Sequence, residues 1–94
     1  MFEEILWKFK ECIRTNRYIV TLHCEEEMDE DELSIFDIEE AILTGTIIER
    51  QKDEETGEWK YLIRGQTIDE SMIQLIAKFG QTKKMVFITV FRDE

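Results

Sequence analysis

The second half of the chain contains four segments rich in β-branched and aromatic residues, and only short links separate them. These segments are residues 46–51, 59–64, 72–79 and 84–91. A parallel pair of strands needs a long crossover, whereas an antiparallel pair needs only a turn. The short links therefore predict a meander of antiparallel strands.

The first half of the chain shows the three- and four-residue spacing of apolar positions that is typical of amphipathic helices. One such stripe crosses residues 2–14, and a second crosses residues 35–42. Ser34 precedes the second stripe and has Asp37 three residues on, which is close to a capping box. Gly45 lies where that helix is expected to end.

Two further segments lie between these helices. Residues 18–22 are β-branched and aromatic, which predicts a short strand whose pairing stays open. Residues 23–32 predict a short acidic helix with Met28 as its buried contact. Because helices come first and strands last, we predict a single α+β domain over residues 1–94. Its N-terminal helices would pack on a four- to five-stranded antiparallel sheet, in two layers.

Acidic residues are concentrated in the middle of the chain. The whole chain has 22 acidic and 12 basic residues, a net charge of −10. Residues 25–58 alone hold fifteen acids and two bases, a net charge of −13, so the rest of the chain is slightly basic. This charge opposes binding to RNA without excluding a local basic groove, and it favours a protein partner with a basic surface.

The sequence also predicts a compartment. No apolar run approaches the roughly 20 residues of a membrane-spanning helix. The chain begins Met1-Phe2-Glu3-Glu4, with acids where a signal peptide has bases. Cys12 and Cys24 are too few for a disulfide scaffold, and we expect both to be small buried residues. We therefore predict a cytoplasmic protein without membrane contact.

His23 is the only histidine, and imidazole exchanges protons near neutral pH. A metal-independent ribonuclease needs a general base, a general acid and cations for the phosphate. His23 is the candidate base, and Arg64 and Tyr61 are the other catalytic candidates. The alternative is that His23 caps the acidic helix or bonds a buried carbonyl. Candidate phosphate contacts are four further bases on or beside the predicted strands: Arg50, Lys52, Lys60 and Arg92.

A metal site is a weaker interpretation of the same region. His23 and Glu27 are four residues apart, which places them on one helix face, with Glu26 or Glu30 nearby. The pattern lacks a second histidine, and it lacks the glycine and glutamate of a calcium loop. We therefore expect a solvated acidic face, with no metal and no cofactor.

Aromatic residues divide into two groups. Five phenylalanines fall mostly on apolar sides and are predicted core residues: Phe9, Phe36, Phe79, Phe87 and Phe91. Trp7 and Trp59 fit those stripes less well, and exposed tryptophan is enriched at interfaces. The predicted protein-binding surface combines the tryptophans with acidic residues: Glu27, Asp29, Glu30, Asp31, Trp7 and Trp59.

Residues 23–28, 35–49 and 86–91 together resemble the domain-of-unknown-function family 4258. Members of that family have a strand running into a His-Ala-x-x-Arg-Met helix. A capped helix, a Gly-x-Ile-Ile-Glu segment and a final strand follow. The resemblance covers roughly residues 18–91. The family layout is similar to the RelE and BrnT toxins, which implies a RelE-like fold and a toxin-antitoxin role. Glu27 departs from this pattern, because relatives have arginine there and a carboxylate repels phosphate.

Three functions stay open on these grounds. The leading one is a RelE- or BrnT-like-fold protein that has weakened or lost nuclease activity and acts as an acidic protein-binding module. Its partner would have a basic surface or be antitoxin-like. The alternatives are a toxin-type ribonuclease with His23 as general base, and a homodimeric structural or regulatory subunit. Strand bases converging on His23 would favour the nuclease, and bases paired with acids would favour the module.

Overall fold

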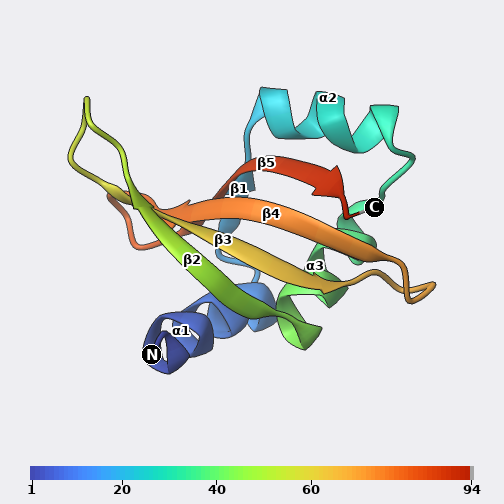
Figure 1. Cartoon of the computed structure of the whole chain (residues 1–94), viewed down its shortest axis with the longest axis horizontal. Coiled ribbons are helices and arrows are strands. Elements are labelled where there is room, and N and C mark those ends of the chain that lie inside the picture. The colour runs from blue at the N-terminus through green and yellow to red at the C-terminus, as the bar shows by residue number, and fades with distance from the viewer. Residues whose placement is uncertain (94) are drawn as a thin grey trace.

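The computed structural model describes residues 1–93, which form three helices and five strands (Figure 1). Each element lies within two residues of its predicted bounds. One difference is at residue 21, where the first strand has already ended and Thr21 caps the next helix. In chain order the elements are α1 (Glu3–Arg14), β1 (Tyr18–Val20), α2 (Leu22–Glu30), α3 (Ile35–Thr44), β2 (Thr46–Lys52), β3 (Trp59–Gln66), β4 (Met72–Phe79) and β5 (Met85–Arg92).

All five strands belong to one sheet, in the order β1-β5-β4-β3-β2. The predicted antiparallel meander from β2 to β5 is confirmed. The sheet is nevertheless mixed, because β1 adds to the outer edge of β5 in parallel, with Ile19 opposite Val86. A parallel pair needs a long connection between its strands, and the chain from the end of β1 to the start of β5 is long enough to provide it.

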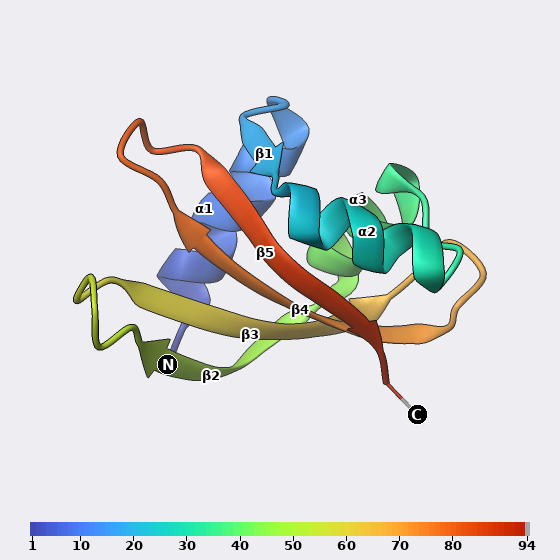
Figure 2. The same cartoon turned by 90° about the horizontal axis from the view of Figure 1, so that it is seen from above.

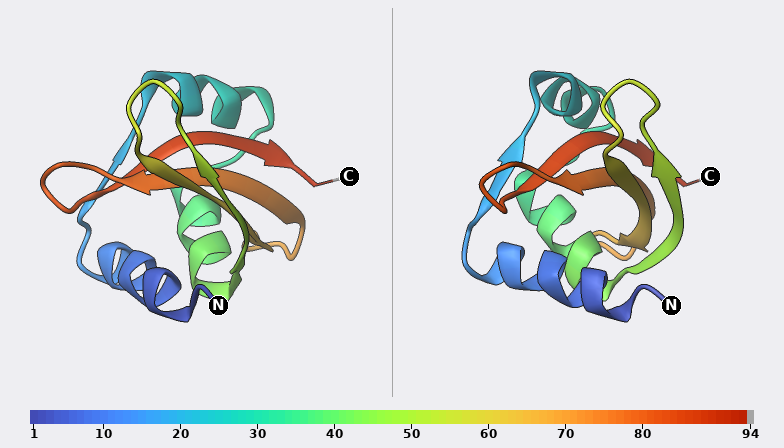
Figure 3. Two further views of the ribbon diagram at one scale, coloured as in Figure 1. Left: turned by 60° about the vertical axis from the view of Figure 1, so that its left-hand side comes forward. Right: turned by 90° about the vertical axis from the view of Figure 1, so that its left-hand side faces the viewer.

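The helices lie on one side of the sheet, which confirms the two-layer α+β architecture. In the right-hand view of Figure 3 the sheet curves around α1 and α3, and its convex face is uncovered. Helix α2 runs alongside β5, as the view from above shows (Figure 2). It lies at the opposite end of the molecule from α1.

Apolar side chains from the helices and the concave sheet face form one core. Phe9 of α1 is fully buried, stacks on Phe79 with ring centroids 4.6 Å apart, and meets Tyr61 edge-on at 5.6 Å. This confirms the expected core role of Phe9. The fully buried large side chains include Ile38, Ile42, Ile63, Ile73, Leu75, Met85 and Phe87.

The prediction that Phe36 and Phe91 are core residues is wrong. Phe36 is 63% exposed, because the neighbouring α3 residues Ile38 and Ile42 face the sheet and turn Phe36 toward solvent. Phe91 is also exposed. It lies opposite Gln74 on the uncovered face of the sheet, beyond an irregularity in the pairing of β4 with β5. Proximity to an apolar stripe was therefore not sufficient to identify a core residue.

Helix α3 lies unusually close to β3 because the residues at their crossing, Ala41 and Gly65, have small side chains or none. A Cβ on Gly65 of β3 would be 1.9 Å from the carbonyl oxygen of Ala41 in α3, and one on Gly45, at the end of α3, would be 2.8 Å from the carbonyl oxygen of Arg64 in β3. The predicted capping box is confirmed, with both Ser34–Asp37 contacts present. Gly45 ends α3 as predicted, but in an extended conformation, so the need for glycine there is close packing.

Candidate functional site

Helix α2 carries His23 and most of the acidic residues of the predicted binding surface, and its position follows from contacts with β5. The hydroxyl of Thr21 accepts a bond from the Cys24 amide at 3.1 Å and donates to the Ile88 carbonyl at 3.3 Å. Cys24 and Met28 are buried as predicted. These contacts hold α2 along the part of the β5 edge that β1 leaves open.

Glu27 is part of this attachment. Its Oε1 accepts hydrogen bonds from the Thr89 hydroxyl and, at 3.1 Å, from the Val90 amide. One turn further on, the Arg92 guanidinium donates to the Asp31 carbonyl at 2.7 Å. The Glu27 carboxylate thus satisfies an edge amide that would otherwise need another strand. This contact gives a structural reason for a carboxylate at the position where the family resemblance has arginine.

We expect Glu27→Ala to lower the free energy of unfolding by about 1–3 kcal/mol, because the part-buried Val90 amide would lose its acceptor. Glu27→Gln keeps an acceptor oxygen and should cost less. Glu26→Ala, at an exposed position of the same helix, is the control and should stay within about 0.5 kcal/mol. Denaturant unfolding measures all three. Equal effects for Glu26→Ala and Glu27→Ala would contradict this role.

The three catalytic candidates lie apart. His23 is on the exposed side of α2, with Nε2 3.3 Å from Glu27 Oε1. Arg64 is on β3, which β4 separates from the β5 edge where α2 lies. Tyr61 is buried against Phe9 in the core, so its ring faces away from solvent. The structure brings no two of these three side chains together.

Two candidate bases on β3, the phosphate-contact candidate Lys60 and the catalytic candidate Arg64, are engaged by carboxylates. Lys60 Nζ lies 3.6 Å from Asp53 Oδ2 at the β2–β3 hairpin. The Arg64 guanidinium forms an ion pair with Asp93. The hydrogen bond from Arg64, followed by one from Gln74, lowers the pKa of Asp93 below its ordinary value. Asp93 therefore stays ionised and keeps Arg64 neutralised.

The other bases are also engaged within the fold. Arg92 bonds the Asp31 carbonyl, as described above. The Arg50 guanidinium lies 4.0 Å from the centre of the Trp59 ring, and Lys52 Nζ lies 5.7 Å from the same ring. Trp59 thus stacks with cations of its own sheet, an arrangement that is favourable by about 0.5–1 kcal/mol at exposed sites. These bases and His23 do not form one basic cleft.

Cys24 is not activated as a nucleophile. Both cysteines are buried and free, as predicted. Burial, and then the charges of Glu27 and Glu25, raise the pKa of the Cys24 thiol to about 11. The thiol is therefore protonated at neutral pH, and it is the thiolate that reacts.

The outward side of α2 and the turn after it form a continuous acidic surface. Its members are Glu25, Glu26, Asp29, Glu30 and Glu32, which we call the acidic face. Among residues 1–93 none of these five carboxylates takes part in an ion pair. Leu22, 71% exposed, begins α2, and the exposed Phe36 follows its far end.

Sequence reasoning missed Leu22 and Phe36 as surface features. The sequence predicts Leu22 in a strand and Phe36 in the core. The helical periodicity of α3 could have identified Phe36. With Ser34 as the N-cap, Ile38 and Ile42 lie on the buried side of the helix, and Phe36 then lies on the opposite, exposed side.

In the described part of the chain, His, Cys, Asp and Glu side chains do not gather in threes in an arrangement suited to a metal ion. None of the helices described has the length and apolar character needed to cross a membrane.

The fold and this surface define a small α+β domain with an acidic helix attached to the sheet edge. A family model described as a domain of unknown function, DUF4258, matches residues 20–92. The chain therefore belongs to the DUF4258 family, as the resemblance implied. No curated protein and no solved structure matches the chain, so the likeness to RelE remains a prediction.

Proposed function

We propose that this protein is an acidic protein-binding module whose acidic face recognises a basic, partly apolar surface on another protein. The observation that carries the proposal is the set of five carboxylates without ion-pair partners on the outward side of α2 and the turn after it. Unpaired like charges destabilise a helix modestly, and an opposite charge from a partner relieves this repulsion.

The exposed apolar side chains at the two ends of α2 add to the argument. Leu22 and Phe36 are large, apolar and mostly solvent-exposed, with the acidic face between them. Apolar side chains surrounded by charged ones are typical of protein-interaction surfaces. The contacts of Glu27 and Asp31 with β5 hold this surface in place, so little ordering is needed when a partner binds.

A ribonuclease mechanism is less well supported. It needs cations near His23 to bind the phosphate, and His23 has carboxylates on its own helix. The strand bases are engaged by Asp53, Asp93 and Trp59 elsewhere in the fold.

The test measures binding of a fluorescent amphipathic peptide of alternating lysine and leucine, by anisotropy. We expect the double variant Glu26→Gln/Glu30→Gln to bind at least about fivefold more weakly than the parent chain. The matched control, Glu54→Gln/Glu55→Gln, removes the same charge from the hairpin tip and should change the affinity less than about twofold. Phe36→Ala should also weaken binding.

Equal losses for the two double variants would contradict the proposal, because binding would then follow net charge alone. Growth arrest on induced expression in a bacterial host is the second readout. Arrest that His23→Ala relieves would replace the binding module with the toxin-type ribonuclease.

A further inference from the structure

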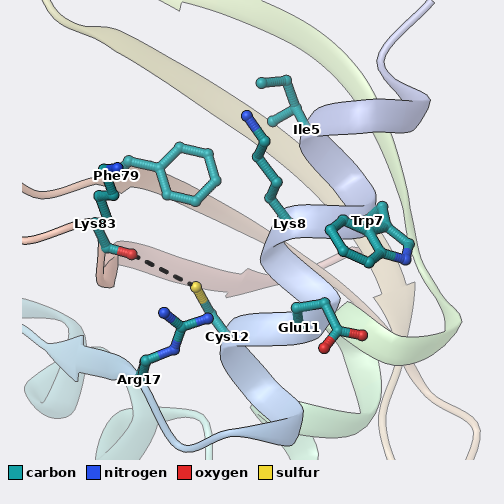
Figure 4. Close-up of a pocket in the computed structure, with 8 residues that line it drawn as sticks. All are labelled: Ile5, Trp7, Lys8, Glu11, Cys12, Arg17, Phe79 and Lys83. Carbon is teal, nitrogen blue, oxygen red and sulfur yellow. Dashed lines mark hydrogen bonds between the residues drawn. The ribbon is translucent and has the colours of Figure 1, made fainter.

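A groove of about 500 Å³ lies between α1 and the β4–β5 hairpin, at the opposite end of the molecule from the acidic face. Its volume is within the range of small-molecule sites in proteins. Figure 4 shows the Phe79 ring and the Lys83 carbonyl facing α1. The lining residues are Ile5, Trp7, Lys8, Glu11, Cys12, Arg17, Phe79 and Lys83.

The inner surface of the groove is apolar. Cys12 is almost fully buried, and Ile5 and Phe79 pack against the core beside it. Trp7, which is 60% exposed, supplies a large aromatic surface at the outer side. This combination suits a ligand with an aromatic or aliphatic body of moderate size.

The charges around the groove are mainly positive, in a protein whose net charge is −10. Lys8, Arg17 and Lys83 contribute three cations, against one acid, Glu11, which is paired with Arg14 at 2.9 Å. Within residues 1–93 neither Arg17 nor Lys83 has an ion-pair partner. Arg17 and Lys83 therefore have charges available for a ligand, whereas Lys60 and Arg64 are already paired with carboxylates.

Hydrogen bonds hold the walls of the groove together. The Arg17 amide donates to the Cys12 carbonyl at 2.9 Å, and the Arg17 carbonyl accepts from the Met85 amide at 3.1 Å. The Cys12 thiol contacts the Lys83 carbonyl at 3.8 Å (Figure 4). The Lys83 amide bonds Gly80 at 3.1 Å within the tight hairpin. The groove is therefore preformed, and its cations are attached to a fixed backbone.

We propose that this groove binds a small organic anion, a carboxylate, sulfonate or phosphate on an apolar body, with Arg17 and Lys83 holding the anionic group. Six of the eight lining residues precede residue 20, where the DUF4258 match begins. The site is thus formed largely by a segment outside the matched family region, closing against Phe79 and Lys83. It is independent of the proposed protein-binding surface.

The probe is anilinonaphthalene sulfonate, an aromatic anion whose fluorescence rises in apolar surroundings. The parent chain should bind it with a dissociation constant on the order of 100 μM at low salt, and more weakly as salt is added. N-phenylnaphthylamine, which has the same rings without the sulfonate, should bind at least about fivefold more weakly. Amide shifts on binding should centre on α1, residues 15–17 and the 80–83 turn.

Charge reversal tests the two assigned cations. Arg17→Glu and Lys83→Glu should each weaken sulfonate binding at least about fivefold, whereas Lys84→Glu should change it less than about twofold. Lys84 is the matched control because it is exposed, adjacent to Lys83 and outside the groove. Circular dichroism of each variant verifies folding.

Three results would overturn the proposal. One is an equal loss of sulfonate affinity for Lys84→Glu and Lys83→Glu, because binding would then follow the net charge of the protein and not a specific site. Another is equal affinity for N-phenylnaphthylamine and for the sulfonate, because the groove would then bind apolar molecules without recognising the anionic group. The third is a set of amide shifts centred on the convex sheet face.

Discussion

Gly65→Ala is expected to lower the free energy of unfolding by more than about 3 kcal/mol. The added Cβ would lie 1.9 Å from the Ala41 carbonyl oxygen and 2.7 Å from its carbon. These are backbone atoms in the middle of α3, so no flexible side chain can move aside. The helix would have to lift from β3 and expose the buried Ile42. Denaturant unfolding at equilibrium measures the loss, which is large beside a typical stability of about 5–15 kcal/mol.

Gly57→Ala is the control for this prediction. Gly57 has φ +75° at the hairpin tip, and nothing lies within 4 Å of an added Cβ there. The cost is then only that of placing alanine in a left-handed conformation, about 1 kcal/mol. If both variants lost the same stability, the close contact between α3 and β3 would be refuted.

Phe9→Ala is the second large effect, with an expected loss of about 3–5 kcal/mol. Phe9 is fully buried and contacts the rings of Phe79 and Tyr61, so its removal leaves a cavity at the junction of α1 and the sheet. Melting of the purified variant, or denaturant unfolding, measures the change. The variant should also lose binding in the α1 groove, because Phe79 would lose its stacking partner.

Phe36→Ala is the matched control, since it removes the same side chain from an exposed site. It should change stability by no more than about 0.5 kcal/mol. A loss of several kcal/mol at Phe36 would mean that its ring is buried in solution, for example by a second copy of the chain. That outcome would favour the homodimeric alternative over the isolated module.

Local sequence signals were sufficient for most elements of this fold. The capping box of Ser34 and Asp37 begins α3 as predicted, because both partners lie within one turn. The meander from β2 to β5 follows from links too short for a parallel crossover. Burial of Cys12 was also predictable, because it lies on the apolar stripe of the first helix. Burial of Met28 was predictable because it is the only large apolar residue of the acidic segment.

Candidate site residues were less predictable, because their roles depend on partners distant in sequence. The charge of Glu27 suggested a binding surface, whereas its hydrogen bonds to Thr89 and Val90 attach α2 to the sheet. Arg64 is a catalytic candidate by its sequence position, whereas in the fold it forms an ion pair with Asp93. Nothing in the local sequence indicates which acid will meet which base.

The sequence by itself thus determined the α+β class, the antiparallel meander and the polarised charge, because these depend on residues near one another in the chain. Only the tertiary structure decided the parallel pairing of β1 with β5, the unpaired state of the acidic face and the groove beside α1. Each of these depends on which distant surfaces pack together, and packing is a property of the whole fold.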